Sequence, residues 1–583
     1  MEPNYSFIFA QISNLRMPYK PAIYLFIFLF CQFRALAQDF HPPLNIPLVL
    51  SGNFGEIRSN HFHSGLDIKT QGRIGLPVFC ITDGTVARVK VSPYGYGKAL
   101  YINHPNGQTS VYAHLNSFSP EIEAWIEDQQ YAQKSYDINT FPPAGKFVFK
   151  KGDEIGKSGN SGSSGGPHLH FEIRDTKTER PINPLKYPFK IADNKAPSIY
   201  GLSVYALDDK SHVNNTHYAN FSMGGSYGNY SLKPGETISA HGNIGFALHT
   251  IDRLDAANNK CGVYKVTLSA GNDILYQFEI DELDFSTNRY MNAHIDYRNY
   301  KKYRKHYHRL YTVENNPLDI YNIRKRNGAL QCIGEGEIPI KITVEDVAGN
   351  ASTLEFTVQC TAQPSTRIIE ANPNQQWVDC KKPFEWKSDI ASVAIPSSCL
   401  YLSEYMDFKS STDNNGLPVL TVGDETYGAQ KSYTLRLKIP ETLMPKANKI
   451  HLGKVAANGR AYPDNPGEVH GAWFEAKNRE FGTYTLLVDT LNPYIKPLSF
   501  YPGKEVRNGN SLRFRIKDSG SGIQEYNMYI DDQWVLASYD YRTGALTHIF
   551  DTERIKPGKH VLRVEILDKV GNLESYSGTF TSY

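Results

Sequence analysis

The chain has 583 residues, and its 62 Lys and Arg nearly balance its 60 Asp and Glu, so the net charge of +2 gives no reason to expect a nucleic-acid partner. This length excludes a single hydrophobic core, and we expect three or four domains. The 38 Tyr and 29 Phe, with Gly and Pro recurring at short intervals, favour a mainly β fold of short strands joined by turns.

Residues 1–37 have the pattern of an export signal peptide. Arg16 and Lys20 precede an apolar run at 22–30, and Ala-Leu-Ala at 35–37 resembles a small-x-small cleavage site. The run is shorter than the ~20 residues that a membrane-spanning helix needs, although a retained membrane anchor stays an alternative. We therefore expect an exported protein, located in the periplasm or cell envelope.

The first region after the signal, residues 38–190, alternates strands and turns. Residues 85–91, 99–103 and 109–115 have the composition of strands, and Gly-containing turns separate them. This pattern predicts a small antiparallel β-sheet domain.

Residues 116–144 interrupt the strand pattern. Ser119 suits a helix N-cap, Pro120 follows it, and acidic residues come next, so a helix is expected to start here. The segment 135–144 has the composition of a loop.

The segment 166–173 predicts a strand that carries two histidines on one face. Leu169 alternates with His168 and His170, and side chains of a strand point to opposite faces with period two. Two imidazoles side by side on a strand are half of a transition-metal site.

A second segment supplies the other half. His63 and Asp67 have the same parity, and Gly65 between them provides a bend that brings their side chains together. With His170 they make a set of two imidazoles and one carboxylate. Such a set suits Zn²⁺ and leaves a fourth position open, which is typical of a catalytic zinc that activates water.

Two further histidines are candidates for proton transfer beside this water. His168 shares its face with His170, and His114 is expected to share a face with Tyr112, while Ala113 and its alternate neighbours pack inward. Imidazole titrates near neutral pH, so either ring can take a proton or stabilise an oxyanion.

Four other residues have two interpretations each. Glu172 is either a partner of a ligand imidazole or a member of a salt bridge. Tyr112 and Asn53 are either substrate contacts or structural residues. His61 is interpreted as a neighbour of His63 rather than a ligand.

Taken together, these motifs resemble the lysostaphin/LytM-type family of zinc peptidases, which cut peptidoglycan peptides. The resemblance is carried by His-x-x-x-Asp at 63–67, Tyr-Ala-His-Leu at 112–115, His-Leu-His-Phe-Glu at 168–172 and the glycine-rich segment 156–167. It covers roughly residues 54–174.

The resemblance implies a role for each histidine. His63, Asp67 and His170 would bind zinc, and His114 and His168 would form the catalytic pair. It also implies an exported zinc metalloendopeptidase that hydrolyses peptide bonds in peptidoglycan stem peptides or cross-bridges. The segment 116–144 stands where the family has a short connection, and we expect it to form a wall or lid at one end of the groove.

The rest of the chain contains an internal repeat. Residues 193–205 and 489–501 share the pattern DxxxPxIxxLSxY, and a DxxGN turn follows in each copy, at 346–350 and 568–572. The repeat predicts two related immunoglobulin-like β-sandwich domains.

We expect these two domains to span residues 191–362, including an insertion, and residues 489–583. Between them, residues 363–488 predict a β-rich domain of unknown class. An envelope protein or glycan is the kind of partner considered for the β-sandwich region, whose architecture alone implies no function.

Two other functions stay open at this stage. One is a catalytically silent regulator that activates other wall hydrolases; such relatives typically lack zinc ligands, whereas this chain keeps them. The other is a surface or adhesion protein whose sandwich domains carry the function.

Overall fold

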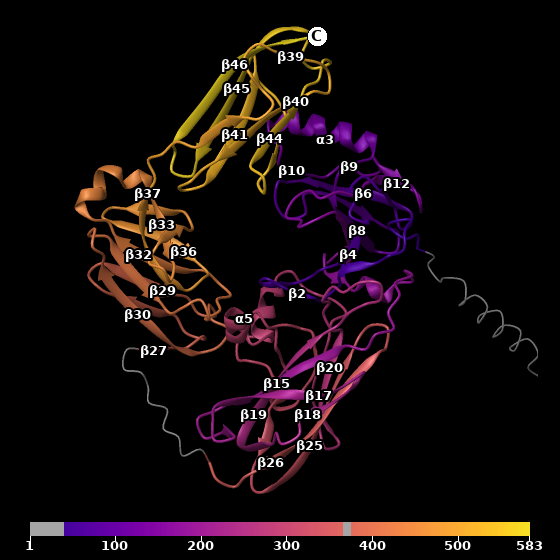
Figure 1. Ribbon diagram of the computed structural model, residues 1–583, viewed down its shortest axis with the longest axis vertical. Helices are drawn as coiled ribbons and strands as arrows, with labels where there is room; N and C mark the ends of the chain where they lie inside the picture. Colours follow the sequence, from indigo (N-terminus) through magenta and orange to yellow (C-terminus); the bar gives the residue numbers. More distant parts are fainter. Residues whose placement is uncertain (1–39, 365–374) are drawn as a thin grey trace, which may run out of the picture.

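The computed structural model describes residues 40–364 and 375–583. Figure 1 shows four groups of strands that follow one another around a ring, which agrees with the expected mainly β fold. Within these residues no helix is long and apolar enough to cross a membrane. The signal peptide expected at 1–37 lies outside the described residues.

The first group contains a nine-stranded antiparallel sheet with the order β1-β4-β13-β8-β7-β6-β10, to which β11 and β14 add at the sides. The strands expected at 85–91, 99–103 and 109–115 are confirmed with slightly wider bounds. A three-stranded sheet and a short hairpin complete the group. The strands are β1 (Leu50–Gly52), β2 (Ile57–Arg58), β3 (His61–Phe62), β4 (Leu66–Lys69), β5 (Pro77–Phe79), β6 (Gly84–Val91), β7 (Lys98–Asn103), β8 (Gln108–Leu115), β9 (Ser117–Phe118), β10 (Ile138–Thr140), β11 (Val148–Phe149), β12 (Glu154–Lys157), β13 (His168–Asp175) and β14 (Pro181–Ile182).

The segment 116–144 forms the helix α3 (Pro120–Gln133) and a short strand. Ser119 precedes the helix as expected, but its side chain makes no cap hydrogen bond. The Glu123 carboxylate instead accepts the Phe118 backbone N–H at 2.8 Å. The loop expected at 135–144 was wrong in part, because β10 (Ile138–Thr140) adds to the edge of β6. A strand of three residues is too short to be recognised in the sequence from the alternation of apolar and polar residues.

The second group is one twelve-stranded sheet, which closes on itself because β19 pairs with both β15 and β26. Its strands are β15 (Ser198–Ala206), β16 (His212–Val213), β17 (Tyr218–Ser226), β18 (Asn229–Leu232), β19 (Ile238–Ile251), β20 (Lys265–Ala270), β21 (Asp273–Glu279), β22 (His308–Arg309), β23 (Tyr321–Arg324), β24 (Leu330–Cys332), β25 (Gly336–Glu345) and β26 (Ala351–Cys360). One 3₁₀ segment, η1 (Pro184–Lys186), precedes this group. The helical segments within the group are η2 (Asn288–Tyr290), α4 (Met291–His294), α5 (Tyr297–Tyr303) and η3 (Lys325–Gly328).

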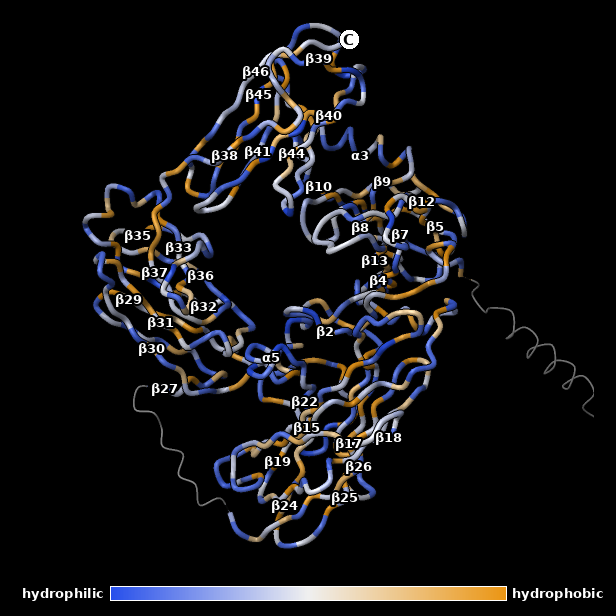
Figure 2. Tube along the Cα trace, in the orientation of Figure 1, coloured by the Kyte–Doolittle hydropathy of each residue, from blue (hydrophilic) through white to orange (hydrophobic). Residues whose placement is uncertain are grey.

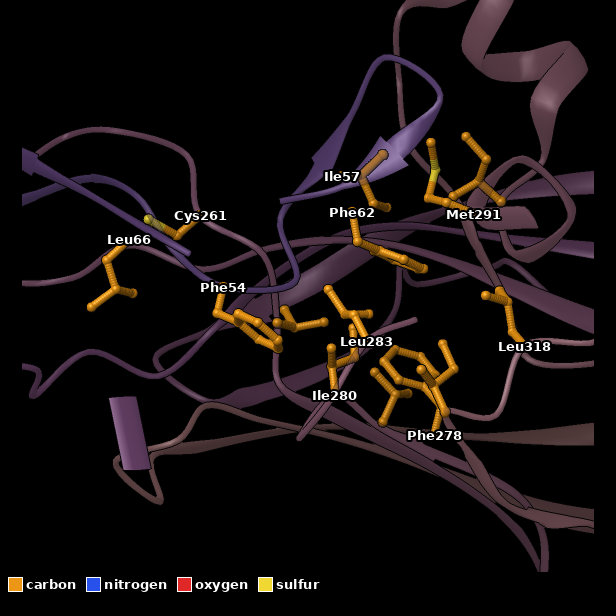
Figure 3. Packing of buried hydrophobic residues seen from close by; sticks show 14 of the residues in the cluster. Phe54, Ile57, Phe62, Leu66, Cys261, Phe278, Ile280, Leu283, Met291 and Leu318 are labelled. Carbon is orange, nitrogen blue, oxygen red and sulfur yellow. The ribbon is translucent and has the colours of Figure 1, made fainter. Parts of the chain in front are cut away.

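The first and second groups share one hydrophobic core. Figure 3 shows Phe54, which precedes the β2–β3 hairpin, and Phe62, which ends it, among Phe278, Ile280 and Leu283 of the second group. Burying side chains of this size contributes roughly 1.5–3 kcal/mol each. Because these contacts are apolar and continuous, the second group supports the hairpin that leads into His63.

The third and fourth groups each consist of two sheets around a separate core. In Figure 2 apolar colour follows the strands of both groups, while their connecting loops are polar. The third group comprises β27 (Gln375–Val378), β28 (Phe384–Lys387), β29 (Ala391–Ile395), β30 (Glu404–Thr412), β31 (Pro418–Val422), β32 (Tyr433–Lys438), η4 (Glu441–Lys449), β33 (Ile450–Val455), β34 (Ala461–Pro463), β35 (Gly467–His470), β36 (Trp473–Asn478) and β37 (Gly482–Val488). The fourth comprises β38 (Tyr494–Pro497), β39 (Lys504–Val506), β40 (Ser511–Lys517), β41 (Ile523–Ile530), β42 (Gln533–Trp534), β43 (Ser538–Asp540), β44 (Ala545–Ile549), β45 (Gly558–Asp568) and β46 (Leu573–Ser582).

One disulfide joins Cys332 to Cys360 in the second group. Cysteine spacing alone predicted no pairing, since the two partners meet only when β24 and β26 fold against β19.

Candidate metal centre

His63, Asp67 and His170 lie together in the first group. Asp67 and His170 are direct partners across β4 and β13, so one strand pair presents both side chains. His63 Nε2 lies 3.1 Å from Asp67 Oδ1 and 3.1 Å from His170 Nδ1, and the remaining separation, between His170 Nδ1 and Asp67 Oδ1, is 2.9 Å.

These three donor atoms fit a single zinc ion. Zinc binds imidazole and carboxylate at about 2.0–2.2 Å, and tetrahedral geometry then places donors roughly 3.3 Å apart. The observed separations are slightly shorter than this, so a small expansion of the triangle accommodates the ion. All three side chains are buried, which limits the ways in which they can rearrange.

Gly65 allows the bend between His63 and β4. A Cβ atom at this position would lie 2.4 Å from the carbonyl oxygen of Phe171. The glycine is therefore required by the close approach of β13, and the bend expected between His63 and Asp67 is confirmed.

Hydrogen bonds on the outer nitrogens orient both imidazoles of the triangle. His63 Nδ1 lies 2.8 Å from the Asn53 carbonyl oxygen, and His170 Nε2 lies 2.7 Å from Glu172 Oε1. Because these oxygens accept, the outer nitrogens carry the protons. The inner nitrogens, His63 Nε2 and His170 Nδ1, thus face Asp67. Burial would lower the pKa of His170, but its hydrogen bonds to Asp67 and Glu172 raise this pKa to about 9, so a metal that binds here must displace the proton on Nδ1.

The charge balance of the triangle favours an ionised Asp67. Burial alone would raise the pKa of this carboxyl, but His63 and the hydrogen bonds from the neighbouring imidazoles outweigh it and hold the pKa well below its usual value. Arg58 Nη2 donates to Asp67 Oδ2 at 2.9 Å, which leaves Oδ1 facing the two imidazoles. Burial also lowers the pKa of His63, so this ring is neutral at pH 7.

His114 and His168 stand beside the triangle. Their ring centroids are 4.8 Å apart, and His168 Nε2 lies 3.4 Å from Asp67 Oδ1. Their outer nitrogens are also fixed, because His114 Nδ1 donates to the Ser161 carbonyl at 2.9 Å and His168 Nδ1 donates to the Gly166 carbonyl at 2.8 Å. Burial lowers the pKa of His114 to about 3. This ring is therefore neutral at pH 7.

The expected shared face of His114 and Tyr112 was wrong. Tyr112 pairs with Phe171 and belongs with it to the main core, while Ala113 pairs with His170. Strict alternation would then turn His114 toward the core. His114 has a left-handed backbone, with φ of 58°, which breaks the alternation and turns the ring toward His168.

Residues 61–132 and 143–184 match the model of Peptidase family M23. The matched segments contain His63, Asp67, His114, His168 and His170. This region is an M23 peptidase domain. Farther along the chain, residues 375–489 match the model of the Zu5-like domain, which assigns a type to the third strand group.

Curated relatives resemble this chain over the M23 domain. A metalloprotease of Haemophilus influenzae is 32% identical over 150 residues, which are 26% of this chain and 24% of that protein. DD-carboxypeptidase/endopeptidase Mpg of Neisseria meningitidis is 32% identical over 123 residues, 21% of this chain and 22% of that protein. Peptidoglycan DD-endopeptidase ShyA of Vibrio cholerae is 29% identical over 132 residues, 23% and 24% of the two chains. The chain thus spans about a quarter of the length of these relatives.

Solved structures match a similar share of this chain, but the match spans most of each solved chain. The catalytic domain of the M23 protein EnpA of Enterococcus faecalis is 23% identical, with a TM-score of 0.20, and the match covers 26% of this chain and 98% of that one. The catalytic domain of lysostaphin of Staphylococcus simulans is 23% identical, with a TM-score of 0.17 and coverages of 23% and 86%.

Behind His170, the M23 domain contains a buried polar group centred on Glu172. This carboxylate accepts hydrogen bonds from His170, from Ser64 at 2.7 Å and from Tyr96, and its other oxygen accepts from Arg174 Nε at 2.6 Å. Burial alone would raise its pKa, but Arg174 and then His170 lower it. Glu172 is therefore a partner of the ligand imidazole, and its salt bridge to Arg174 is buried rather than at the surface.

Tyr96 was missed by the sequence analysis, which interpreted residues 94–97 as a turn. Its ring stacks on His170 with centroids 5.1 Å apart, and its hydroxyl contacts Glu172. The only available signal was an aromatic residue next to Gly97, which is too common to indicate a site.

The other weighed residues have structural roles. The Asn53 side chain bonds both the N–H and the carbonyl of Gly262 at 2.8 Å, which connects the M23 domain to the second group. The Tyr112 hydroxyl accepts the Ile81 N–H at 3.1 Å within the core. His61 is exposed, and its ring contacts the Ser59 carbonyl.

The part of the domain that departs from the family is shorter than expected. Between residues 61 and 184 the family model leaves only 133–142 unmatched, so most of the segment 116–144, including nearly all of α3, lies within the matched residues.

The fourth strand group contacts the M23 domain at α3 and at the glycine-rich loop. In Figure 1 the yellow strands of this group lie against α3. Arg554 forms ion pairs with Glu127 at 2.9 Å and Asp128 at 3.1 Å. At the loop, Arg542 Nη1 donates to the Ser164 carbonyl at 2.7 Å. A cavity of about 1000 Å³ lies between the two regions, and Ser161 is among its lining residues.

Proposed function

We propose that this protein is an exported zinc metalloendopeptidase that hydrolyses peptide bonds in the stem peptides or cross-bridges of peptidoglycan. The observation that carries the proposal is the set of four imidazoles around Asp67. Each has its outer nitrogen bonded to a fixed acceptor, so its inner nitrogen is directed to the centre without reorganisation. The full donor set argues against a silent regulator.

In this proposal His63, Asp67 and His170 hold the metal. When bound there, Zn²⁺ supplies a Lewis acid for the scissile carbonyl and lowers the pKa of a coordinated water. His114 Nδ1 is already committed to the Ser161 carbonyl, so Nε2 is the ring nitrogen that is placed to take a proton. His168 presents Nε2 beside Asp67 for the developing oxyanion or the leaving amine.

Peptidoglycan as the substrate is supported by the relatives named as DD-endopeptidases, one of them for peptidoglycan. The glycine-rich loop fits an extended peptide, because added Cβ atoms at Gly165 and Gly166 would meet nothing within 4 Å. The loop therefore borders open space beside His168. An envelope location, with residues 1–37 as the export signal, agrees with this substrate.

We further propose that the fourth strand group restricts access to this groove. Arg542 and Tyr541 contact Ser164 and Ser163 of the loop, and Ser164 Oγ lies 3.2 Å from His168 Nδ1. Ser164 therefore connects Arg542 to His168, a member of the proposed catalytic pair. The contact consists of polar bonds at a partly exposed surface, which open more readily than an apolar core.

Digestion of purified peptidoglycan tests the function. The zinc-loaded protein should release products cut at peptide bonds, with glycan strands intact, as identified by mass spectrometry. His63→Ala should release none, because it removes one donor of the triangle. His61→Ala is the matched control, two residues away and exposed, and should digest as the wild type does. Cleavage of glycan bonds, or equal digestion by His63→Ala, would overturn the proposal.

A further inference from the structure

Two groups of three aspartates occupy matching places in the second and fourth strand groups. Asp193, Asp252 and Asp346 offer oxygens that all lie within 4.8 Å of one another, and so do Asp489, Asp518 and Asp568. Neither group belongs to the M23 domain.

The matching positions follow from the internal repeat. Asp193 and Asp489 precede the first strand of their groups, β15 and β38. Asp252 and Asp518 come directly after β19 and β40. The third aspartate begins the DxxGN turn in each copy. Each trio therefore connects the entering segment, one strand end and one turn.

An asparagine holds each trio in the same way. In the first copy Asn350 donates its backbone N–H to Asp346 Oδ1 at 2.8 Å and its side-chain N–H to Oδ2 at 2.7 Å. The same side chain reaches the Asp193 carbonyl at 3.3 Å. The Asp346 carboxylate thus has a fixed orientation.

The second copy repeats these bonds. Asn572 donates to Asp568 Oδ1 and Oδ2 at 2.7 and 2.6 Å, and to the Asp489 carbonyl at 3.0 Å. Two distant segments of the chain therefore fold to the same arrangement of carboxylates.

The middle aspartate has an oxygen that the protein leaves without a partner. Asp252 is 1% exposed, and its buried Oδ1 finds no hydrogen-bond partner among the described residues. The equivalent atom, Asp518 Oδ1, is also buried and without a partner there. A buried carboxylate oxygen without a partner is costly, and such groups are normally paired or bound to a metal.

Among the described residues no lysine or arginine pairs directly with a trio, although the charges of Lys195 and Arg253 lower the pKa values of Asp193 and Asp252 in part. Within residues 40–364 and 375–583, no lysine or arginine forms an ion pair with any of these six aspartates; Lys195, which follows Asp193 closely, donates to the Leu254 carbonyl at 3.1 Å instead. Burial, and next the charge of Asp193, raise the pKa of Asp252 to about 8. Ionising all three carboxyls of the first trio is therefore unfavourable, and a bound cation would offset their mutual repulsion.

The second trio is partly compensated. Asp518 Oδ2 accepts the N–H groups of Gly520 and Gly522, and Asp489 Oδ2 accepts that of Ser521 at 2.6 Å. The ring of His451 lies near enough to interact with the three carboxylates. We therefore expect weaker cation binding here than at the first trio.

We propose that each trio binds one calcium ion, which fixes the segment entering a strand group to the turn at the same end. Oxygen-only donors select hard cations, and Ca²⁺ tolerates the irregular coordination that carboxylates, backbone carbonyls and water provide. Asp193 follows the M23 domain, and Asp489 is the last residue of the Zu5-like match. The two ions would thus stiffen the two junctions that place the strand groups in the ring.

Calcium titration of the full-length protein tests the proposal. The chelator-stripped protein is first saturated with zinc, so that the His63–Asp67–His170 group no longer responds, and CaCl₂ is then added in a calorimeter. Two calcium ions per chain are expected. At a concentration one hundred times the dissociation constant, the apparent unfolding temperature should rise by roughly 5 °C.

Single substitutions assign the sites. Asp252→Asn should remove one ion and Asp518→Asn the other, while Asp273→Asn, an exposed surface aspartate of the second group, should leave both. Each trio is tested by its own variant, so failure of one variant to fold leaves the other informative. Unchanged calcium stoichiometry in both variants, or no calcium binding by the wild type, would overturn the proposal and indicate carboxyls that share protons. Peptidoglycan digestion plays no part in either readout.

Discussion

Two groups of three side chains hold their donor atoms close together, but they do so with different chemistry. One is His63–Asp67–His170 and the other is Asp193–Asp252–Asp346. Each brings three donors within 4.8 Å. In the first, outer hydrogen bonds orient two imidazoles and a salt bridge stabilises the carboxylate. In the second, one carboxylate oxygen has no partner. The first is suited to zinc and reactivity, and the second to a hard ion and rigidity.

Selective removal of ions should give the largest effect and separate the two groups. A chelator that prefers zinc, such as 1,10-phenanthroline, should abolish peptidoglycan hydrolysis and leave the calcium-dependent unfolding temperature in place. Protein that is stripped of both ions and reloaded with zinc alone should keep hydrolysis and lose the calcium-dependent rise in unfolding temperature. The measurement is product release and thermal unfolding on the same samples; loss of hydrolysis only on calcium removal would contradict the assignment.

Glu172 positions His170 in the zinc group, and its negative charge is expected to strengthen zinc binding. Glu172→Gln keeps the shape but removes the charge that accepts the His170 Nε2 proton, so zinc affinity should fall about 10–100-fold. Competition with a fluorescent zinc chelator measures it. Glu179→Gln is the control, because Glu179 also pairs with Arg174 but lies half-exposed, away from the imidazoles. Equal zinc affinity in the two variants would show that the Glu172 charge has no such role.

In the Asp193–Asp252–Asp346 group, Asn350 orients a carboxylate in the way that Glu172 orients His170. Asn350→Ala removes the side-chain bonds to Asp346 and Asp193, which should lower calcium affinity at this site by up to about thirtyfold, since each of the two lost bonds costs about 1 kcal/mol. Calorimetry with Asn572→Ala should show the same loss at the second site only. A loss at both sites from either variant would contradict two independent ions.

The smallest expected effect concerns access to the zinc group. Arg542→Ala removes the bond to the Ser164 carbonyl, worth about 1 kcal/mol, so kcat/KM for soluble muropeptides should rise about fivefold. Arg513→Ala, an exposed arginine of the same strand group, should change nothing. A fall in kcat/KM for Arg542→Ala would mean that the contact assists the substrate.

The sequence predicted the M23 fold and its donor triangle because the relevant residues are close in the chain or lie on regular strands. His63 and Asp67 need one bend, and His168 and His170 need only the strand period. The mainly β fold and the repeat were likewise visible from strand composition and turn signatures.

Other features required the tertiary structure. His114 faces the site only because its left-handed backbone breaks the alternation, a conformation that a non-glycine residue rarely signals in sequence. Asp252 and Asp518 stand at strand ends in segments that share little local pattern, so neither was linked to the repeat. The disulfide and the contact of Arg542 with Ser164 depend on segments far apart in the chain.

Parallel measurement of bound zinc and peptidoglycan hydrolysis in His170→Ala and His114→Ala tests the central claim most directly. His170 supplies a donor of the triangle, whereas His114 lies outside it and is assigned to proton transfer. His170→Ala should lose both zinc and hydrolysis, and His114→Ala should keep one zinc per chain while losing hydrolysis. Substantial hydrolysis by both variants, or full zinc in His170→Ala, would contradict the account.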